Sequence, residues 1–236
     1  MERLLGPEDK IKFDCNPSLS CFTKCCSDVN IILNPYDVLR MKNALKITST
    51  KFLEKYTHVL YKEKGLIPVV ILKMREDKRC PFVSKYGCII YHDRPWACRM
   101  FPLDPVEEGR FRLLVGPERC FGLREKKEWK VEEWLKSQGI EEYEEMNRGF
   151  FEITKKIKAL ETEVDDPKVR EMIFMSLYDI DRFREFILKT SFFERFELNQ
   201  EIVKENDKEL LKLGYNWIKF GLFGEMTLKL RRYRND

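Results

Sequence analysis

The stretch Cys80-PFVSKYG-Cys88-IIYHDRPWA-Cys98 sets the organisation of this chain, because three cysteines fall within loops broken by proline and glycine. Four of the remaining five cysteines form an earlier group, and the fifth lies after both stretches: Cys15, Cys21, Cys25 and Cys26, then Cys120. No cysteine follows Cys120, so residues 121–236 contain none. Such clustering has three physical causes, which are disulfides, a bound metal, or catalysis by thiols.

The expected compartment narrows this choice. The first residues, MERLLGPEDKIKF, carry charges throughout and contain no apolar run like the core of a signal peptide. No apolar stretch approaches the roughly 20 residues that span a bilayer. We therefore expect a cytoplasmic protein with no membrane segment, in which thiols stay reduced and disulfides are uncommon. Metal binding is the interpretation we favour over a disulfide framework or ordinary buried thiols.

The composition indicates a globular protein. The 236 residues suffice for one large or two small domains, and 43% of them are hydrophobic. A chain of this length builds its own core and does not need a disulfide framework. The 44 basic and 40 acidic side chains leave a net charge of +4, which gives no evidence for a nucleic-acid partner.

The first half has the pattern of a small α+β unit. Ile11–Phe13 and the β-branched run IPVVILKM predict strands, as does the segment Cys88–Tyr91. Asn34-Pro35 predicts the start of a helix, since Asn is a good N-cap and Pro fits the first helical position. Arg94-Pro95 predicts a helical turn that carries Cys98.

From about Lys126 the hydrophobic period changes from two to 3.6 residues, which indicates helices. We expect one helix over Tyr143–Leu160, another from Asp166-Pro167 through Ile187, and a last one near Asp207–Phe223. The predicted fold class is therefore α+β: a cysteine-rich metal-binding domain over residues 1–124, followed by an all-helical bundle or cap over residues 125–236.

Thiolates bind soft or borderline metals, so the candidates are zinc and iron–sulfur clusters. Four thiolates suffice for one structural zinc or one cubane cluster, and eight suffice for two sites or for one site with spare thiols. The adjacent pair Cys25-Cys26 favours a polynuclear cluster, two neighbouring sites, or one ligand beside a structural thiol. All eight cysteines are candidate metal ligands: Cys15, Cys21, Cys25, Cys26, Cys80, Cys88, Cys98 and Cys120.

The spacings exclude several familiar sites. No C-x₂-C pair is present, which excludes a zinc ribbon and a thiol-redox pair, and the ferredoxin run is also missing. Cys21-FTK-Cys25 begins a radical-enzyme signature, but Asp28 stands where its third cysteine belongs. The chain has only two histidines, and we expect His92 to be a loop residue and not a ligand.

These residues resemble the YkgJ-like cysteine cluster family, whose CxxCxxCC domain is described as zinc- or iron-chelating. The resemblance rests on the double cysteine of the first block, on IILNPYDVLRMKNALKI, and on the pattern Cys-x-Ile-Tyr…Arg-Pro-x-x-Cys-Arg-x-Phe-Pro around Cys98. It covers about Phe13 to Gly122. The first block departs from the family name, since its spacings are five and three instead of two and two. The resemblance implies a cysteine-ligated metal, and the flagellin lysine-N-methylases look like distant members with an iron–sulfur cluster.

Arg94 and Arg99 flank Cys98 and are candidate cofactor-binding residues. They would donate hydrogen bonds to cluster sulfurs or neutralise a thiolate-rich site. The alternative is a salt bridge, with Asp93 or Asp104, that only orients the loop.

No acid–base constellation and no glycine-rich loop after a strand is visible, so no catalytic residue is assigned. Two hypotheses therefore stay open. In the first, an iron–sulfur cluster, possibly of the [4Fe-4S] type, serves electron transfer or a group transfer such as protein lysine methylation. In the second, zinc stabilises a non-catalytic module whose helical half recognises a protein partner. For either function, we expect a protein partner or protein substrate to bind through the helical half.

Overall fold

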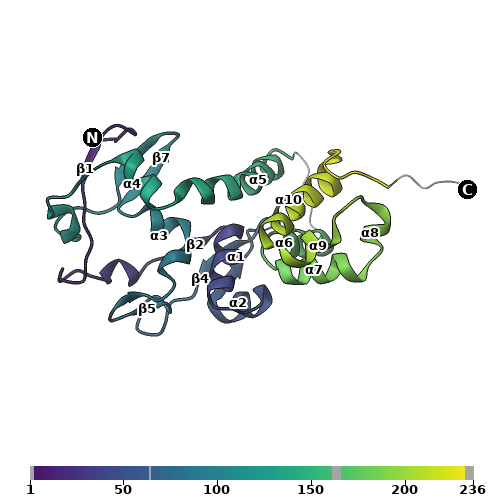
Figure 1. The fold of residues 1–236 in the computed structure, drawn as a ribbon, viewed down its shortest axis with the longest axis horizontal. Helices are drawn as coiled ribbons and strands as arrows, with labels where there is room; N and C mark the ends of the chain where they lie inside the picture. The colour runs from purple at the N-terminus through teal and green to yellow at the C-terminus, as the bar shows by residue number, and fades with distance from the viewer. Residues whose placement is uncertain (1–2, 64, 161–165, 232–236) are drawn as a thin grey trace, which may run out of the picture. The chain divides into compact units, whose positions relative to one another are not determined.

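The computed structural model describes residues 3–63, 65–160 and 166–231, and the chain forms two compact units (Figure 1). Unit 1 comprises Met1–Ile32 and Leu72–Glu144, and unit 2 comprises Leu33–Ile71 and Glu145–Asp236. Each unit therefore combines two separate stretches of sequence. The boundary expected between residues 124 and 125 stays a prediction. The two compact units are not consecutive in sequence, because residues 33–71 pack with the C-terminal helices.

Unit 1 is built from short strand pairs and small helices. Strand β1 (Lys10–Lys12) pairs antiparallel with β9 (Glu128–Lys130), which joins the two ends of the unit's sequence. Three further elements follow one another along the chain: the hairpin β5–β6 (Val83–Ser84 and Gly87–Cys88), helix α3 (Trp96–Met100), and the hairpin β7–β8 (Leu103–Glu107 and Arg110–Leu113). Helix α4 (Val131–Ser137) comes directly after β9.

An apolar core holds these pieces together. Phe13, Met100 and Trp134 are buried in it, and the rings of Phe13 and Trp134 meet edge to face with centroids 5.0 Å apart. Such aromatic pairs add about 1 kcal/mol beyond the area they bury. Cys120 belongs to the same cluster, so one of the candidate ligands lies at the edge of the core.

A three-stranded sheet has the order β2-β4-β3, formed by Ile32–Leu33, Val69–Leu72 and Thr57–Leu60. The central strand is the β-branched run that the sequence predicts as a strand. Val70 and Leu72 are buried on one of its faces, as alternation along a strand requires.

The helices of unit 2 begin where the sequence supplies caps. Helix α1 (Pro35–Ala44) starts with a capping box between Asn34 and Asp37. Helix α2 (Ser49–Tyr56) is capped by Thr48, whose side chain accepts a hydrogen bond from the amide of Lys51. The remaining helices are α5 (Ile140–Lys158, which begins in unit 1), α6 (Pro167–Leu177), α7 (Ile180–Lys189), α8 (Phe192–Arg195), α9 (Gln200–Glu205) and α10 (Asp207–Phe223).

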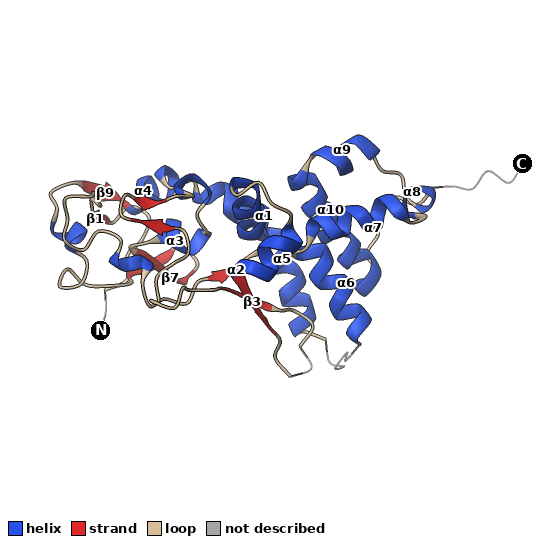
Figure 2. Cartoon of the chain, turned by 90° about the horizontal axis from the view of Figure 1, so that it is seen from below, coloured by secondary structure: helices blue, strands red, loops and turns tan. Residues whose placement is uncertain are grey.

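Helix α10 is the centre of this helical bundle and packs against α6, α7 and α9 (Figure 2). Gly214 allows the close approach of α6, because a Cβ atom there would lie 2.2 Å from the carbonyl oxygen of Ser176. Leu210, Leu211 and Ile218 are fully buried along α10, which confirms the amphipathic helix predicted near Asp207–Phe223.

The α+β class is confirmed, but two elements differ from the prediction. The helix expected from Asp166 through Ile187 is broken at Tyr178 and Asp179, because the Asp179 carboxylate accepts hydrogen bonds from the hydroxyls of Ser49 and Thr50. The strand expected at Cys88–Tyr91 ends at Cys88, and a 3₁₀ turn follows over Tyr91–Asp93. Within the described residues, no helix combines the length and the apolar character that a bilayer crossing needs.

Candidate metal centre

The first cysteine block lies on a loop that turns sharply at the double cysteine. A 3₁₀ turn covers Lys24–Cys26, and it is flanked by Thr23 (φ 65°) and Asp28 (φ 53°) in the left-handed region. Non-glycine residues enter that region at a cost on the order of 1 kcal/mol, so the surrounding structure must hold them there. Part of that support is the amide of Asp28, which donates to the carbonyl of Lys78 at 2.9 Å. The turn around Cys25-Cys26 is therefore fixed by the segment that precedes Cys80.

The second block is joined to the first by backbone hydrogen bonds. The amide of Cys80 donates to the carbonyl of Cys26 at 2.8 Å, so these two cysteines lie on neighbouring backbone segments. Cys88 pairs with Val83 across the β5–β6 hairpin, and the amide of Val83 donates to the carbonyl of Cys80 at 3.2 Å. Cys98 follows on helix α3, as the sequence predicts.

The outlying Cys120 also lies beside the first block. It precedes a 3₁₀ turn, Phe121–Arg124, whose first amide donates to the sulfur of Cys21 at 3.3 Å. The amide of Asp14, next to Cys15, donates to the carbonyl of Gly122 at 3.0 Å. A Cβ atom on Gly122 would lie 2.8 Å from the carbonyl of Asp14, so glycine permits this close approach. All eight cysteines belong to unit 1, and none of the eight forms a disulfide in the described structure.

The thiols of the first block influence one another electrostatically. Burial, with repulsion from Cys25, Cys120 and Cys21, raises the pKa of Cys15 to about 11. A hydrogen bond from the Cys26 thiol lowers the pKa of Cys25 to about 7, and the same bond raises the pKa of Cys26. The thiolate is the form that binds metals, so the lowered pKa of Cys25 favours its metal-binding form.

The second block contributes to the same electrostatic group. Burial raises the pKa of both Cys80 and Cys88, and the nearby Cys25 thiol adds to the rise at Cys88. The thiols of Cys98 and Cys80 likewise add to the raised pKa of Cys26. A cation bound among these groups would relieve the repulsion and favour the thiolate forms.

The donor chemistry therefore fits a thiophilic metal, but the sulfurs do not form a coordination shell. Over residues 3–63, 65–160 and 166–231, no three cysteine, histidine or carboxylate side chains lie close enough together to hold one ion. The structure brings the cysteine-bearing segments together through their backbone and does not gather the thiols around a point. His92 is exposed on the turn after Cys88, and its backbone carbonyl accepts a hydrogen bond from Arg99.

Arg94 and Arg99 are buried, with 8% and 7% of their surface exposed. The Arg94 guanidinium stacks on the Tyr91 ring at 3.8 Å, and it donates to the Tyr91 carbonyl at 2.6 Å and to the side-chain oxygen of Gln138. The three donor groups of Arg99 bind the carbonyls of Arg94, Gln138 and His92. That Arg94 and Arg99 bind a cofactor stays a prediction. The hydrogen-bond donors of Arg99 are directed at backbone oxygens instead of sulfurs.

The alternative salt bridge of these arginines is not formed. Asp104 pairs instead with Arg112, at 2.7 Å. Among the described residues, neither Arg94 nor Arg99 contacts a carboxylate. Burial lowers the pKa of Arg94, as does the nearby Arg99 charge, whereas Tyr91 and the thiols of Cys98 and Cys88 oppose that change. The two guanidiniums therefore form a positive region beside the second cysteine block.

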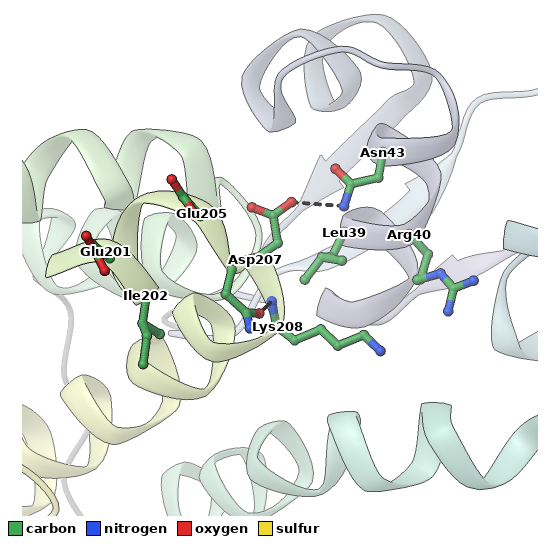
Figure 3. Close-up of a pocket in the computed structure, with 9 residues that line it drawn as sticks. Leu39, Arg40, Asn43, Glu201, Ile202, Glu205, Asp207 and Lys208 are labelled. Carbon is green, nitrogen blue, oxygen red and sulfur yellow. Dashed lines mark hydrogen bonds between the residues drawn. The ribbon is translucent and has the colours of Figure 1, made fainter. Parts of the chain in front are cut away.

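A pocket of about 720 Å³ lies elsewhere, within unit 2 (Figure 3). Its wall comes from α1, α9 and the start of α10, and Asn43 reaches across to donate to the carboxylate of Asp207 at 2.9 Å. The lining contains carboxylates and cations together but no cysteine, so it favours no particular ligand class and is separate from the thiol group. Its lining residues are Leu39, Arg40, Asn43, Glu201, Ile202, Glu205, Asn206, Asp207 and Lys208.

A comparison with protein families identifies the cysteine-bearing region. A family model named CxxCxxCC and described as "Putative zinc- or iron-chelating domain" matches residues 14–134, just over half of the chain. The match includes all eight cysteines and both buried arginines. No curated protein and no solved structure matches the chain.

Proposed function

The chain belongs to the CxxCxxCC family, and from that premise we propose that it binds a thiophilic metal through the cysteines of unit 1, as an iron–sulfur cluster. The observation that carries the proposal is the convergence of three separate cysteine segments. Backbone bonds link Cys26 to Cys80, and the sulfur of Cys21 accepts from the amide that follows Cys120. Eight thiols in one compact unit are soft donors, which suit iron and zinc.

The number and spacing of the thiols favour the cluster over a single zinc ion. A structural zinc needs four thiolates, and this unit has twice as many. Cys25 and Cys26 are adjacent in sequence and share a hydrogen bond, an arrangement that suits two metal atoms better than one. A bound cluster would supply one-electron chemistry. The residues of the chain would bind it, limit the access of water and set the charge around it.

The second candidate is a zinc-stabilised module without catalysis. The cysteine-bearing segments have little regular structure, since β5 and β6 are two residues each and the first block contains a single 3₁₀ turn. A metal that ties such loops together contributes directly to folding. In this case a protein partner would bind through the helical unit, as the sequence predicts for either function.

Elemental analysis of the protein purified without oxygen distinguishes the two candidates. The proposal predicts iron and acid-labile sulfide, about four of each per cubane cluster, with visible thiolate-to-iron absorption. Colourless protein with stoichiometric zinc and no iron would reject the cluster and support the zinc module. Protein that takes up neither metal, even after reconstitution with iron and sulfide or with zinc, would reject metal binding altogether.

A further inference from the structure

Two buried cations of unit 1 have only neutral hydrogen-bond partners. Arg94 donates to a carbonyl and an amide oxygen, and Arg99 donates to three carbonyls. Their aromatic contacts are Tyr91, and Tyr143 at 4.4 Å from the guanidinium of Arg99. Buried charges in proteins are normally paired with opposite charges, because desolvation of a single ion is costly. Here two like charges are neighbours and no carboxylate of the described chain contacts either.

We propose that Arg94 supplies the fixed positive charge that balances the thiolates of the metal centre, and that Arg99 positions Arg94. This inference rests on the proposed function, since it requires the thiols to bind metal as thiolates. Four thiolates around Zn²⁺ leave a net charge of about minus two, and the two guanidiniums would offset that charge. The region that is unbalanced without metal becomes neutral when metal is bound.

The division of roles follows from the contacts. Arg94 lies between Cys88 and Cys98 in the sequence. Its guanidinium uses one donor on the loop carbonyl of Tyr91 and another on the side chain of Gln138. Arg99 is fully engaged in holding the backbone: its Nε donates to the carbonyl of Arg94 at 3.1 Å, and one Nη donates to the carbonyl of Gln138 at 2.5 Å. It thereby ties the loop between Cys88 and Cys98 to the turn after α4.

That turn depends on glycine. Gly139 has φ +66°, and a Cβ atom there would lie 3.5 Å from an Nη atom of Arg99. Glycine adopts the left-handed conformation without steric cost, and this allows the carbonyl of Gln138 to face Arg99. The hydroxyl of Tyr143, four residues further on, donates to the carbonyl of Arg94 at 3.2 Å. The position of Arg94 is thus set from both sides of the turn.

The test compares charge with shape at Arg94 in the full chain. Arg94→Lys keeps the charge and loses the planar fork, whereas Arg94→Gln removes the charge. The matched control is Arg112→Gln, an exposed arginine of the same unit that pairs with Asp104. Zinc affinity is measured by competition with a chelator. We expect R94Q to bind zinc at least about tenfold more weakly, R94K within about threefold of wild type, and R112Q unchanged.

The melting temperature of the metal-free protein is a second readout. We expect R94Q not to lower it, although the same variant weakens zinc binding. Removal of an unbalanced buried charge should leave the melting temperature of metal-free R94Q equal to or above that of wild type. In the iron-loaded protein, R94Q should lower the reduction potential, because loss of a positive charge disfavours the reduced state.

Two outcomes would overturn the inference while leaving the proposed function intact. Wild-type zinc affinity in R94Q would show that the charge has no effect on the site. Equal weakening in R94Q and R94K, with a lower melting temperature or loss of folding in metal-free R94Q, would show that Arg94 acts only by shape. A wild-type chain that binds no metal would instead overturn the proposed function, and this inference with it.

Discussion

The two units differ in the partners of their buried cationic side chains. In unit 2, Lys42 is 5% exposed, and its Nζ lies 3.1 Å from Asp181 and 2.9 Å from Asp207. Arg184 pairs with the same two carboxylates, so two cations and two anions form a closed group. In unit 1, the hydrogen-bond acceptors described for Arg94 and Arg99 are carbonyl and amide oxygens, which carry no charge.

This difference indicates what each unit needs in order to be stable. The four charges of this group in unit 2 balance one another, so the group needs no ligand to be electrically neutral. The positive region of unit 1 lies beside thiols whose pKa values are raised by burial and mutual repulsion. Under the proposed function, metal binding would convert those thiols into anions and supply the negative charge that balances the arginines.

Removal of the metal should have the largest effect, and it should be confined to unit 1. Amide exchange of the full chain, followed by mass spectrometry of its peptides, measures this directly. We expect peptides around Cys26, Cys80 and Cys98 to lose protection at least about tenfold after chelation, while those of α10 keep theirs. Equal loss in both units, or no change around the cysteines, would contradict the contrast.

Removal of the buried lysine in unit 2 should cost less but still be severe. Lys42→Met leaves the carboxylates of Asp181 and Asp207 with Arg184 as their remaining shared cation, and we expect the free energy of unfolding to fall by about 3 kcal/mol. Lys212→Met is the matched control, because Lys212 makes an exposed pair with Glu209 that contributes less than about 0.5 kcal/mol. Denaturant unfolding of the metal-loaded protein measures both. A K42M loss no larger than that of K212M would disprove the closed charge group.

Acid should weaken unit 2 through the same carboxylates. Burial opposes the ionisation of Asp181, but the amide of Ser49 and the charge of Lys42 outweigh it, so its pKa is lowered. The pKa of Asp207 is also lowered, since Lys42 and Asn43 outweigh its burial. Their stabilisation is complete above the ordinary aspartate pKa of about 3.9 and is lost as the pH falls through the lower folded-state values.

The double variant Asp181→Asn/Asp207→Asn isolates this contribution. The free energy of unfolding of the wild type should decrease between about pH 5 and pH 3 more steeply than that of the double variant, because the asparagines do not titrate. Parallel curves for the two proteins would show that these carboxylates have ordinary pKa values in the folded state.

The smallest effect concerns a helix cap of unit 2. The side chain of Asn206 accepts hydrogen bonds from the amides of Lys208 and Glu209, both at 3.1 Å, at the start of α10. Asn206→Ala should lower the free energy of unfolding by about 1 kcal/mol and leave the metal content unchanged. A loss of metal in this variant would show that the metal centre depends on the helical unit, contrary to the contrast.

The sequence predicts those elements whose signals are local. Asn34-Pro35 begins α1 and Asp166-Pro167 begins α6, because a cap acts within its own first turn. The break after α6 has no such signal. It depends on Asp179 accepting a bond at 2.7 Å from the hydroxyl of Ser49, 130 positions away in the sequence. The periodicity of apolar residues continues through the break, so it predicts one helix where there are two.

The candidate site divides in the same way. The cysteines and the flanking arginines are identifiable from residue type and spacing alone. The contact between Cys21 and the residue after Cys120 spans 100 positions, and Gln138 is 44 positions from Arg94. No pattern in the sequence marks Gln138 or Tyr143 as supports of the arginines, because their role arises from tertiary packing. The interleaving of the two units has the same origin.

The most direct test of the account is the metal content per chain of anaerobically purified wild type and two neighbouring variants. Cys88→Ser removes a candidate ligand, and Ile89→Ser changes the adjacent residue, which is 65% exposed and has no thiol. The account predicts iron and labile sulfide in wild type and I89S, and their loss in C88S. Equal metal content in all three proteins, or no metal in any, would contradict it.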